Sequence, residues 1–283
     1  MKLSEMKQFL AESDFQLTKS LGQNFLHDGN QLRRIVAAAN LSPTDKVLEV
    51  GPGLGPLTEL LLAKAGEVLA VEMDQRLVQA LRTRCASHLP PSPASKLTLV
   101  HADALDYLRR EKRDWSAWKL VSNLPYSVGS PILVELATAT GPKTLVATLQ
   151  MEVIRRLAAK AGEDDYGLLT LLIQLHYEPR DWFKIPASCF FPEPDVESAC
   201  IAMDRRSEPL LAPSLHKAFM RTVKLAFSQR RKMMLKLLKQ DHPPGKLESA
   251  FAEIGLDLKT RAERVTLEQF VNLLKLLYEG KAP

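Results

Sequence analysis

The hydrophobic pattern of the first 150 residues predicts short buried strands that alternate with helices. Runs of apolar residues with strand length occupy 46–50, 67–72, 97–100 and 144–150, and a further strand includes Leu120 and Val121. Helical spacing of apolar residues follows the first run, and further helices are predicted at about 75–85 and 131–139. Nearly continuous apolar strands separated by helices are typical of a parallel sheet that is covered on both faces. We therefore predict an α/β fold with a Rossmann-like sheet.

The pattern changes after Met203, where only helical spacing remains. Helices are predicted at 214–240, 246–255 and 266–279, the first with an apolar stripe of Leu215, Phe219, Val223 and Phe227. The stretch 205–213 (RRSEPLLAP) fits neither pattern, so we place a domain boundary there. This gives a Rossmann-like domain over residues 1–205 and a small all-helical domain over 206–283. A Pro-rich stretch at 89–95 predicts a surface loop.

Composition narrows the class of protein. With 283 residues, 25% of them charged and 46% hydrophobic, the chain suits a globular protein of one or two domains. Its cysteines, Cys85, Cys189 and Cys200, form no CxxC pair and no cluster with histidines, so we expect neither a disulfide framework nor a metal site. No apolar run approaches the ~18 residues of a membrane span, and the N-terminus lacks a signal-peptide pattern. We therefore expect a cytoplasmic protein that does not bind membranes.

The basic residues are concentrated in one part of the chain. The net charge is only +5, but residues 214–240 contain no Asp or Glu. The Lys and Arg residues of this window are Lys217, Arg221, Lys224, Arg230, Arg231, Lys232, Lys236 and Lys239. A solvated helix face is the ordinary explanation of basic residues, whereas a stretch without compensating acids favours a polyanionic partner such as a nucleic acid.

A glycine-rich turn, EVGPGLG at 49–55, lies between the first strand and the helix after it. Glycines let the backbone approach a ligand closely, and a helix N-terminus offers free N–H groups. The spacing of Gly51, Gly53 and Gly55 is typical of S-adenosylmethionine sites. The dinucleotide fingerprint instead requires a small residue where Pro56 stands, which disfavours a nicotinamide cofactor.

Acidic residues follow the next two strands at the same edge of the predicted sheet. Glu72 lies about 20 residues beyond Gly51, where a carboxylate can accept hydrogen bonds from both hydroxyls of a ribose. Asp103 follows the strand at 97–100, where it can accept from an adenine amino group. A helix N-cap is the alternative explanation of either residue. Together with the glycine turn, the two acids indicate a cofactor that contains adenosine.

The sequence Asn123-Leu-Pro-Tyr126 ends the fourth strand at this edge. An exocyclic amine of a purine is a poor nucleophile, because its lone pair is delocalised into the ring. Asn123 Oδ1 and the Leu124 carbonyl could accept its N–H hydrogens, with Pro125 fixing their geometry and Tyr126 stacking on the base. A plain turn at a strand end is the alternative. The motif therefore indicates chemistry at an amino nitrogen.

These motifs, in this order, resemble the KsgA family of small-subunit rRNA adenine dimethyltransferases from Ser20 to beyond Arg264. The matching pieces are GQNFL (22–26), the glycine turn, Glu72, Asp103, NLPY (123–126), FFPEPDVESA (190–199), FSQRRK (227–232) and RAE (261–263). The resemblance implies a cofactor, S-adenosylmethionine, contacted by Asn24, Leu26, Gly51, Gly53, Glu72, Asp103 and Asn123. It also implies that Phe190 clamps the target adenine opposite Tyr126.

The family further implies an activity and a partner. Members transfer methyl groups to N6 of two adjacent adenosines near the 3′ end of 16S rRNA, so we expect 16S rRNA in the small subunit or its precursor, and a monomeric enzyme. The rRNA phosphates are expected on the basic helical face, at Arg221, Lys224, Arg230, Arg231 and Lys232, with further contacts from Arg33, Arg34, Arg155 and Arg156. Two positions depart from the family pattern: Asp195 replaces a basic residue, and residues 233–237 lack the usual Thr and Asn.

Three other functions remain open at this point. A methyltransferase of the large ribosomal subunit shares the fold and the NLPY-like turn, although the QRRK stretch and the full helical tail favour the small-subunit enzyme. A noncatalytic ribosome-assembly or transcription factor could keep the fold for RNA binding alone, but the intact glycine turn, Glu72 and Asn123 argue against lost catalysis. A nicotinamide-dependent oxidoreductase is disfavoured by Pro56.

Overall fold

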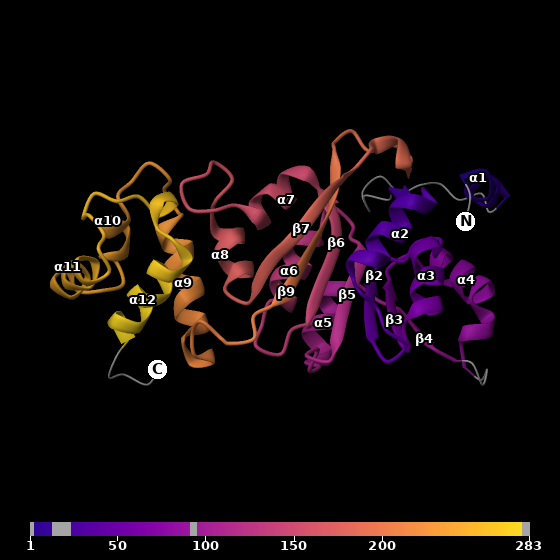
Figure 1. Ribbon diagram of the computed structural model, residues 1–283, viewed down its shortest axis with the longest axis horizontal. Coiled ribbons are helices and arrows are strands. Elements are labelled where there is room, and N and C mark those ends of the chain that lie inside the picture. Colours follow the sequence, from indigo (N-terminus) through magenta and orange to yellow (C-terminus); the bar gives the residue numbers. More distant parts are fainter. Residues whose placement is uncertain (1–2, 13–23, 91–94, 279–283) are drawn as a thin grey trace. The chain divides into compact units, whose positions relative to one another are not determined.

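The computed structural model describes residues 3–12, 24–90 and 95–278 (Figure 1). The chain forms two compact units. The first comprises the chain up to Ile154 together with Pro179–Arg205, and the second comprises Arg155–Glu178 and the chain from Arg206 onward. Gly22 and Gln23 of the GQNFL motif, and residues 91–94 of the expected Pro-rich loop, lie outside the described residues.

A seven-stranded sheet of order β4-β3-β2-β5-β6-β9-β7 is the larger of the two sheets in the described residues. The strands are β1 (Phe25–Leu26), β2 (Lys46–Val50), β3 (Glu67–Glu72), β4 (Leu97–His101), β5 (Trp118–Asn123), β6 (Thr144–Gln150), β7 (Tyr177–Ile185), β8 (Phe190–Phe191) and β9 (Ser198–Arg205). Strands β2 to β6 pair in parallel, which confirms the predicted sheet, and the bounds of β2, β3 and β6 match the predicted ranges. Strands β1 and β8 form a separate antiparallel pair.

The strand β9 was not among the predicted strands, and it is not parallel to its neighbour β6. β9 pairs antiparallel with β6, with Thr144 opposite Asp204 and Gln150 opposite Ser198. Parallel neighbours are usually joined by one helical crossover. The chain between β6 and β9 instead includes α7 (Met151–Ala158), α8 (Leu168–Gln174) and the further strand β7. The sheet is therefore mixed at this edge.

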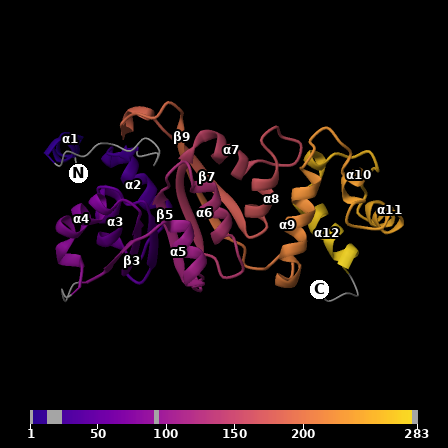
Figure 2. The same cartoon turned by 180° about the vertical axis from the view of Figure 1, so that it is seen from behind.

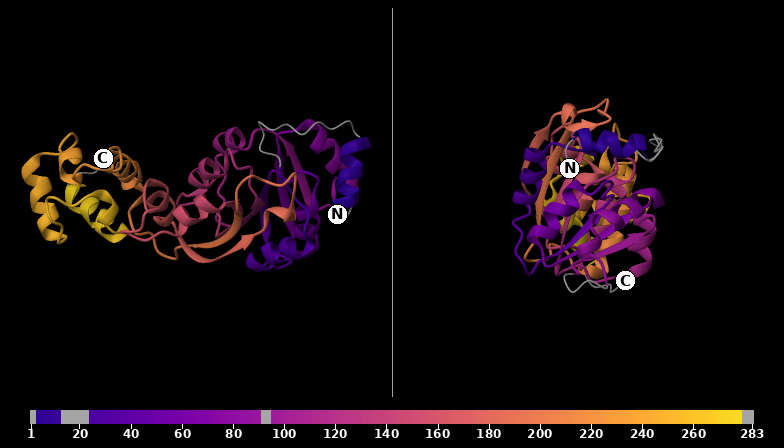
Figure 3. Two further views of the ribbon diagram at one scale, coloured as in Figure 1. Left: turned by 90° about the horizontal axis from the view of Figure 1, so that it is seen from above. Right: turned by 90° about the vertical axis from the view of Figure 1, so that its right-hand side faces the viewer.

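Helices cover both faces of the sheet. The helices of the described residues are α1 (Leu3–Glu12), α2 (Gly29–Ala38), α3 (Pro56–Lys64), α4 (Gln75–Arg84), α5 (Ala104–Glu111), α6 (Gly129–Leu136), α7 (Met151–Ala158), α8 (Leu168–Gln174), α9 (His216–Ala226), α10 (Met234–Leu238), α11 (Pro244–Glu253) and α12 (Leu267–Tyr278), and α8 to α12 belong to the second unit. α2 packs beside α3, and α5 packs beside α6 (Figure 2). The two pairs lie on opposite faces (Figure 3), as right-handed crossovers to the two sides of β2 require. No helix among the described residues is long and apolar enough to cross a bilayer.

The second unit has its own hydrophobic core, which draws in part of the chain before residue 206. Tyr166 and Leu171 are buried together with Phe219, Phe251 and Phe270. The sequence placed a single boundary at 205/206, whereas the chain passes between the units there and also after Ile154 and after Glu178. The leucines of α8 explain the difference, because they bury their side chains among the helices rather than on the sheet.

The predicted helix over 214–240 is wrong as a continuous element. α9 ends at Ala226 and α10 begins at Met234, and the FSQRRK stretch forms turns between them. The Ser228 hydroxyl donates to the Leu225 carbonyl at 2.7 Å, and the Met234 amide donates to the Thr260 carbonyl at 2.9 Å instead of continuing the helix. Side-chain and tertiary hydrogen bonds therefore replace the helical ladder here.

Candidate cofactor and substrate site

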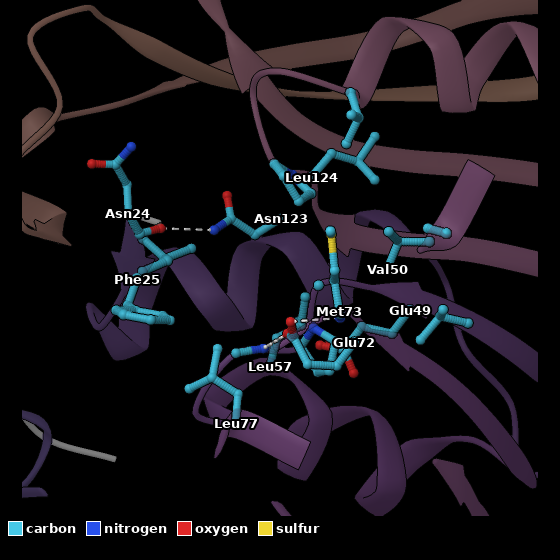
Figure 4. A pocket seen from close by; sticks show the side chains of 18 of the residues that line it. Asn24, Phe25, Glu49, Val50, Leu57, Glu72, Met73, Leu77, Asn123 and Leu124 are labelled. Carbon is cyan, nitrogen blue, oxygen red and sulfur yellow. Dashed lines mark hydrogen bonds between the residues drawn. The ribbon is translucent and has the colours of Figure 1, made fainter. Parts of the chain in front are cut away.

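The main cavity lies where the order of the sheet reverses, between β2 and β5. Connections leave these two strands toward opposite edges, and ligands of open α/β sheets bind beyond the carboxyl ends of the strands at such a point. The cavity has a volume of about 310 Å³ and is lined by the ends of β1 to β5 and the turns that follow them (Figure 4). A pocket of this size suits a small organic ligand.

The glycine turn forms one wall of the cavity with a backbone that other residues could not adopt without strain. Gly51 and Gly53 have φ angles of 66° and 59°. A Cβ atom on Gly53 would lie 2.8 Å from Cε1 of Phe25, and one on Gly51 would lie 3.1 Å from Cγ of Pro125. The turn is thus held between the QNFL segment and the NLPY segment, which brings three sequence motifs together.

The carboxylate of Glu72 fastens the same turn to the end of β3. One oxygen accepts from the Gly53 amide at 3.1 Å, and the other accepts from the amides of Met73 and Asp74 at 2.8 and 2.9 Å. Burial raises the pKa of Glu72, although these three amides favour its charged form. The residue also lines the cavity, and a carboxylate has further lone pairs to offer a hydroxyl.

Asp103 is both a helix N-cap and a residue of the cavity lining, which are the two roles that the sequence left open. It is the N-cap of α5, with Oδ1 accepting from the Asp106 amide at 3.0 Å. Its side chain also lines the cavity at the carboxyl end of β4. A helix cap and a ligand contact can therefore reside in one carboxylate, because capping occupies a single oxygen.

Asn123 presents an unpaired acceptor at the carboxyl end of β5. Its Nδ2 donates to the Asn24 carbonyl at 3.2 Å, which fixes the orientation of the amide (Figure 4). Its Oδ1 is buried and has no hydrogen-bond partner within the described part of the chain. A buried acceptor without a partner costs roughly 1–3 kcal/mol. Such an atom beside a cavity is typical of a group that awaits a donor from a ligand.

The two aromatic residues assigned to the target base occupy different environments. Tyr126 lines the cavity and hydrogen-bonds through its hydroxyl to Ser198 at the start of β9. Phe190 is 1% exposed and packs in the core with Leu26 and Leu32. The structure does not bring the Phe190 ring to the cavity, because the pairing of Phe190 with Leu26 turns the side chain into that core. Its clamping role stays a prediction.

Glu49 belongs to the glycine motif, although no role was predicted for it from the sequence. The side chain lines the cavity, is 1% exposed, and has an Oε2 atom with no partner among the described residues. Burial raises its pKa to about 8; the nearby Thr58 hydroxyl opposes this rise and Glu72 adds to it. The available signal was an acid in the otherwise apolar part of a buried strand, KVLEV.

The basic residues expected to hold RNA lie in the second unit, and they differ in their partners. Arg221 forms a bidentate ion pair with Asp241, at 2.6 Å for both contacts, and Arg230 donates to the Asp164 carbonyl at 2.8 Å. Lys224, Arg231 and Lys232 are exposed, and no ion pair joins them to another described residue. Within the same ranges, no group of three His, Cys, Asp or Glu side chains could hold a metal ion.

Comparison with known proteins identifies the family. The family model described as ribosomal RNA adenine dimethylase matches residues 14–279. The chain belongs to this family. It is therefore an S-adenosylmethionine-dependent rRNA adenine dimethyltransferase, which confirms the predicted family, fold class and enzyme class. Among proteins named ribosomal RNA small subunit methyltransferase A, that of Geobacillus thermodenitrificans is 37% identical over 96% of this chain and 94% of its own length. That of Anoxybacillus flavithermus is 38% identical over the same shares of the two chains.

Solved structures agree with the fold. The 23S rRNA methyltransferase ErmE aligns with a TM-score of 0.67 and 28% identity, over 90% of this chain and 100% of that chain. A dimethyladenosine transferase from Plasmodium falciparum aligns with a TM-score of 0.73 and 22% identity, over 88% and 95% of the two chains. Both alignments cover most of this chain and support its fold class.

Proposed function

We propose that the protein transfers methyl groups from S-adenosylmethionine to N6 of two adjacent adenosines near the 3′ end of 16S rRNA in the small ribosomal subunit. The observation that carries this proposal is the unpaired, buried Oδ1 of Asn123 at the cavity. An amino nitrogen offers the N–H group that this acceptor lacks. The names of relatives that are 36–38% identical to this chain support the choice of the small subunit.

The residues at the carboxyl ends of β2, β3 and β4 suit the adenosine cofactor. Gly51 and Gly53 leave space for close approach of a ligand, Glu72 can accept from the ribose hydroxyls, and Asp103 can accept from the adenine amine. Asn24 and Leu26 also line this cavity and would face the same ligand. When bound, S-adenosylmethionine supplies a methyl group made electrophilic by its sulfonium charge.

The NLPY turn would prepare the nucleophile. Asn123 Oδ1 and the Leu124 carbonyl accept the two N–H hydrogens of the adenine amine, which favours a tetrahedral nitrogen whose lone pair is free to react. The nitrogen becomes acidic as it is alkylated, so its proton passes to solvent without a strong base. A second transfer requires space for the methyl group already added, and the apolar Pro125 and Val128 at the cavity provide an apolar lining.

The second unit would hold the rRNA backbone. Its exposed cations at Lys224, Arg231 and Lys232 are free to pair with phosphates, whereas Arg221 and Arg230 would first have to exchange their present partners. Phosphate contacts position a nucleic acid and make its binding dependent on salt. The choice of base would then rest with the NLPY turn in the first unit.

The test uses the full chain with labelled S-adenosylmethionine and three substrates: undermethylated 30S subunits, free 16S rRNA and undermethylated 50S subunits. Digestion to nucleosides and mapping of the modified positions identify the product. We expect N6,N6-dimethyladenosine at two adjacent positions near the 3′ end of 16S rRNA. Dimethyladenosine only in the 50S reaction would replace this proposal with a 23S rRNA target, and the absence of dimethyladenosine from every reaction would refute it.

A further inference from the structure

The charge of the main cavity is unusual for a protein with a net charge of +5. Three carboxylates line it, from Glu49, Glu72 and Asp103, and no Lys, Arg or His is among its described lining residues. Two of these carboxylates have donors of their own, since Glu72 accepts three backbone amides and Asp103 caps α5. Glu49 differs from both because its Oε2 has no partner in the described chain.

The position of Glu49 explains why it has no such partner. It belongs to β2, where its backbone pairs with Ala70 of β3 inside the sheet, so no exposed turn is available to supply amides. The side chain is buried between the sheet and α3, and it reaches the cavity just before the glycine turn. An ionised carboxylate in such a place is strongly unfavourable unless a cation or donors accompany it.

The proposed ligand is positively charged as the methyl donor and loses that charge when it has given up its methyl group. S-adenosylmethionine has a permanent positive charge on sulfur, whereas the product S-adenosylhomocysteine has a neutral thioether. Their amino and carboxylate groups are the same. A cation that enters a buried, carboxylate-lined cavity favours ionisation of a carboxyl group there.

We propose that Glu49 senses the charge of the cofactor: it loses its proton to solvent when S-adenosylmethionine binds and regains one from solvent when the neutral product occupies the cavity. This inference rests on the proposed function, because it assumes S-adenosylmethionine as the ligand. Glu49 thus helps the protein to distinguish the methyl donor from the product. The O–H bond is the only bond of Glu49 that breaks or forms. The release of product is thereby favoured over the release of donor as pH rises.

Three titratable or polar groups of the described chain face Glu49 from the elements packed against it. They are the Glu72 carboxylate of β3, the Thr58 hydroxyl of α3 and the Cys85 thiol at the end of α4. Burial raises the pKa of the Cys85 thiol to about 11, so the thiol stays neutral. Burial raises the pKa of the Glu72 carboxyl group, whereas its three backbone amides favour the charged form. Burial holds the pKa of Glu49 at about 8 in the empty protein, so its proton is present at pH 7.

The sign of the pH dependence follows from linkage. A ligand that binds the ionised form more tightly gains affinity as pH rises toward the pKa of the free protein, by at most about tenfold per pH unit. The donor should therefore bind more tightly at pH 8 than at pH 6, and the product should change less. The α-amino groups of the two ligands also titrate, and the sulfonium charge lowers the pKa of the one in the donor, so the Glu49→Gln variant measured with the same ligands isolates the contribution of Glu49.

The test is calorimetric titration of the full chain with S-adenosylmethionine, S-adenosylhomocysteine and sinefungin, whose amine replaces the methylsulfonium with another positive charge. Titrations at pH 6, 7 and 8, in buffers of different ionisation enthalpy, give the affinities and the number of protons released. We expect S-adenosylmethionine and sinefungin to release more protons at pH 7 than S-adenosylhomocysteine does. We also expect the donor-to-product affinity ratio to rise severalfold from pH 6 to pH 8.

Variants then assign the proton to one residue. Glu49→Gln should abolish the extra proton release and make the affinity ratio independent of pH, while Glu49→Asp retains a titrating carboxyl group. Glu59→Gln on the outer part of α3 is the matched control and should behave as the wild type. Equal proton release for donor and product in the wild type would overturn the inference even if Glu49→Gln failed to fold. Failure of S-adenosylmethionine to bind at all would instead refute the proposed function.

Discussion

Asp45 and Glu49 lie near opposite ends of β2, and both are buried, with exposures of 5% and 1%. Asp45 is fully partnered: Lys119 lies 3.0 Å from its Oδ2, Lys143 lies 2.6 Å from its Oδ1, and the Ser42 amide and hydroxyl also donate to it. Glu49 has an oxygen with no described partner. The pKa values move in opposite directions accordingly.

Burial alone would raise the pKa of Asp45, but Lys143, Ser42 and Lys119 together lower it well below its ordinary value. Burial raises the pKa of Glu49 to about 8. The amino edge of the sheet thus uses a buried charge to join segments that are far apart in the sequence. The carboxyl edge keeps one oxygen of the buried Glu49, and the Asn123 amide oxygen, without described partners. The difference teaches that a fully partnered buried charge can hold distant segments together, whereas a buried oxygen without a partner beside a cavity can await a donor from a ligand.

The largest effect is a loss of stability, which we expect when the ion pairs of Asp45 at the amino end of β2 are removed. Asp45→Ala removes both ion pairs and leaves the Lys119 ammonium, whose side chain is 10% exposed, without its counter-charge. Loss of one partner of a buried ion pair costs about 3–5 kcal/mol. Urea denaturation should show a fall of this size in the free energy of unfolding. Glu67→Gln, which breaks the exposed pair with Lys46, is the control and should cost less than about 1 kcal/mol.

An equal loss in the two variants would contradict the structural role of Asp45. The methyltransferase rate per folded molecule should change little in either, because neither residue lines the cavity. Asp45 also predicts a direction with pH. Its folded-state pKa is depressed, so its contribution to stability is present above its ordinary value of 3.8 and is lost as pH falls through the folded-state value.

The next effect is a loss of methyl transfer when the Asn123 acceptor at the carboxyl edge of the sheet is removed. Asn123→Ala removes the open acceptor, and loss of one transition-state hydrogen bond in a preorganised site lowers turnover by about 10²–10³-fold. The free energy of unfolding should fall by no more than about 0.5–1.5 kcal/mol, since the variant loses the single Nδ2 hydrogen bond to the Asn24 carbonyl and Oδ1 has no described partner to lose. Single-turnover methyl transfer, measured beside urea denaturation, checks both statements. Ser127→Ala at the exposed rim of the cavity is the control, and comparable activity of the two variants would remove Asn123 from the mechanism.

Sequence patterns anticipated the satisfied parts of the fold better than the unsatisfied ones. The runs at 46–50, 67–72 and 144–150 have the bounds of β2, β3 and β6, because a strand that is covered on both faces needs apolar residues at nearly every position. β7 was missed, since its sequence YEPRDWFKI is largely exposed at the sheet edge and lacks an apolar run. The break at 227–233 was missed because it depends on tertiary hydrogen bonds, to Thr260 among others.

The site shows the same limit. Gly51, Gly53, Glu72, Asp103 and Asn123 were all predicted, and the structure gathers them at one cavity, because the carboxyl ends of parallel strands share an edge. The side chain of Phe190 points into the core, which the family motif alone does not reveal. The burial of Glu49 depends on how α3 packs over β2, and the sequence contains no local sign of its missing partner.

The third prediction concerns the pH dependence of stability, which the buried carboxyl group of Glu49 should control. The folded-state pKa of Glu49 is about 8 against an ordinary 4.5, so the folded protein binds the extra proton between these values. The stability of the cofactor-free protein should therefore fall as pH rises from 4.5 to 8. Glu49→Gln should flatten this dependence and stabilise the empty protein at pH 8 by roughly 1–3 kcal/mol. Urea denaturation at pH 6 and pH 8 measures it, with Glu59→Gln as control; parallel pH profiles for Glu49→Gln and wild type would contradict the prediction.

The smallest effect extends the comparison to the second unit, where Arg221 is paired with Asp241 and Arg231 and Lys232 have no described ion pair. If unpaired charge marks the ligand site there too, the double variant Arg231→Ala with Lys232→Ala should weaken RNA binding severalfold. The slope of log K against log salt should become less negative by about 0.7–0.9 for each phosphate that the variant no longer neutralises. Arg221→Ala should change that slope less, because its guanidinium already has a carboxylate. Filter binding of 16S rRNA at several salt concentrations measures both slopes. An equal change of slope for the paired and the unpaired cations would contradict the prediction that unpaired charge marks the RNA-binding residues.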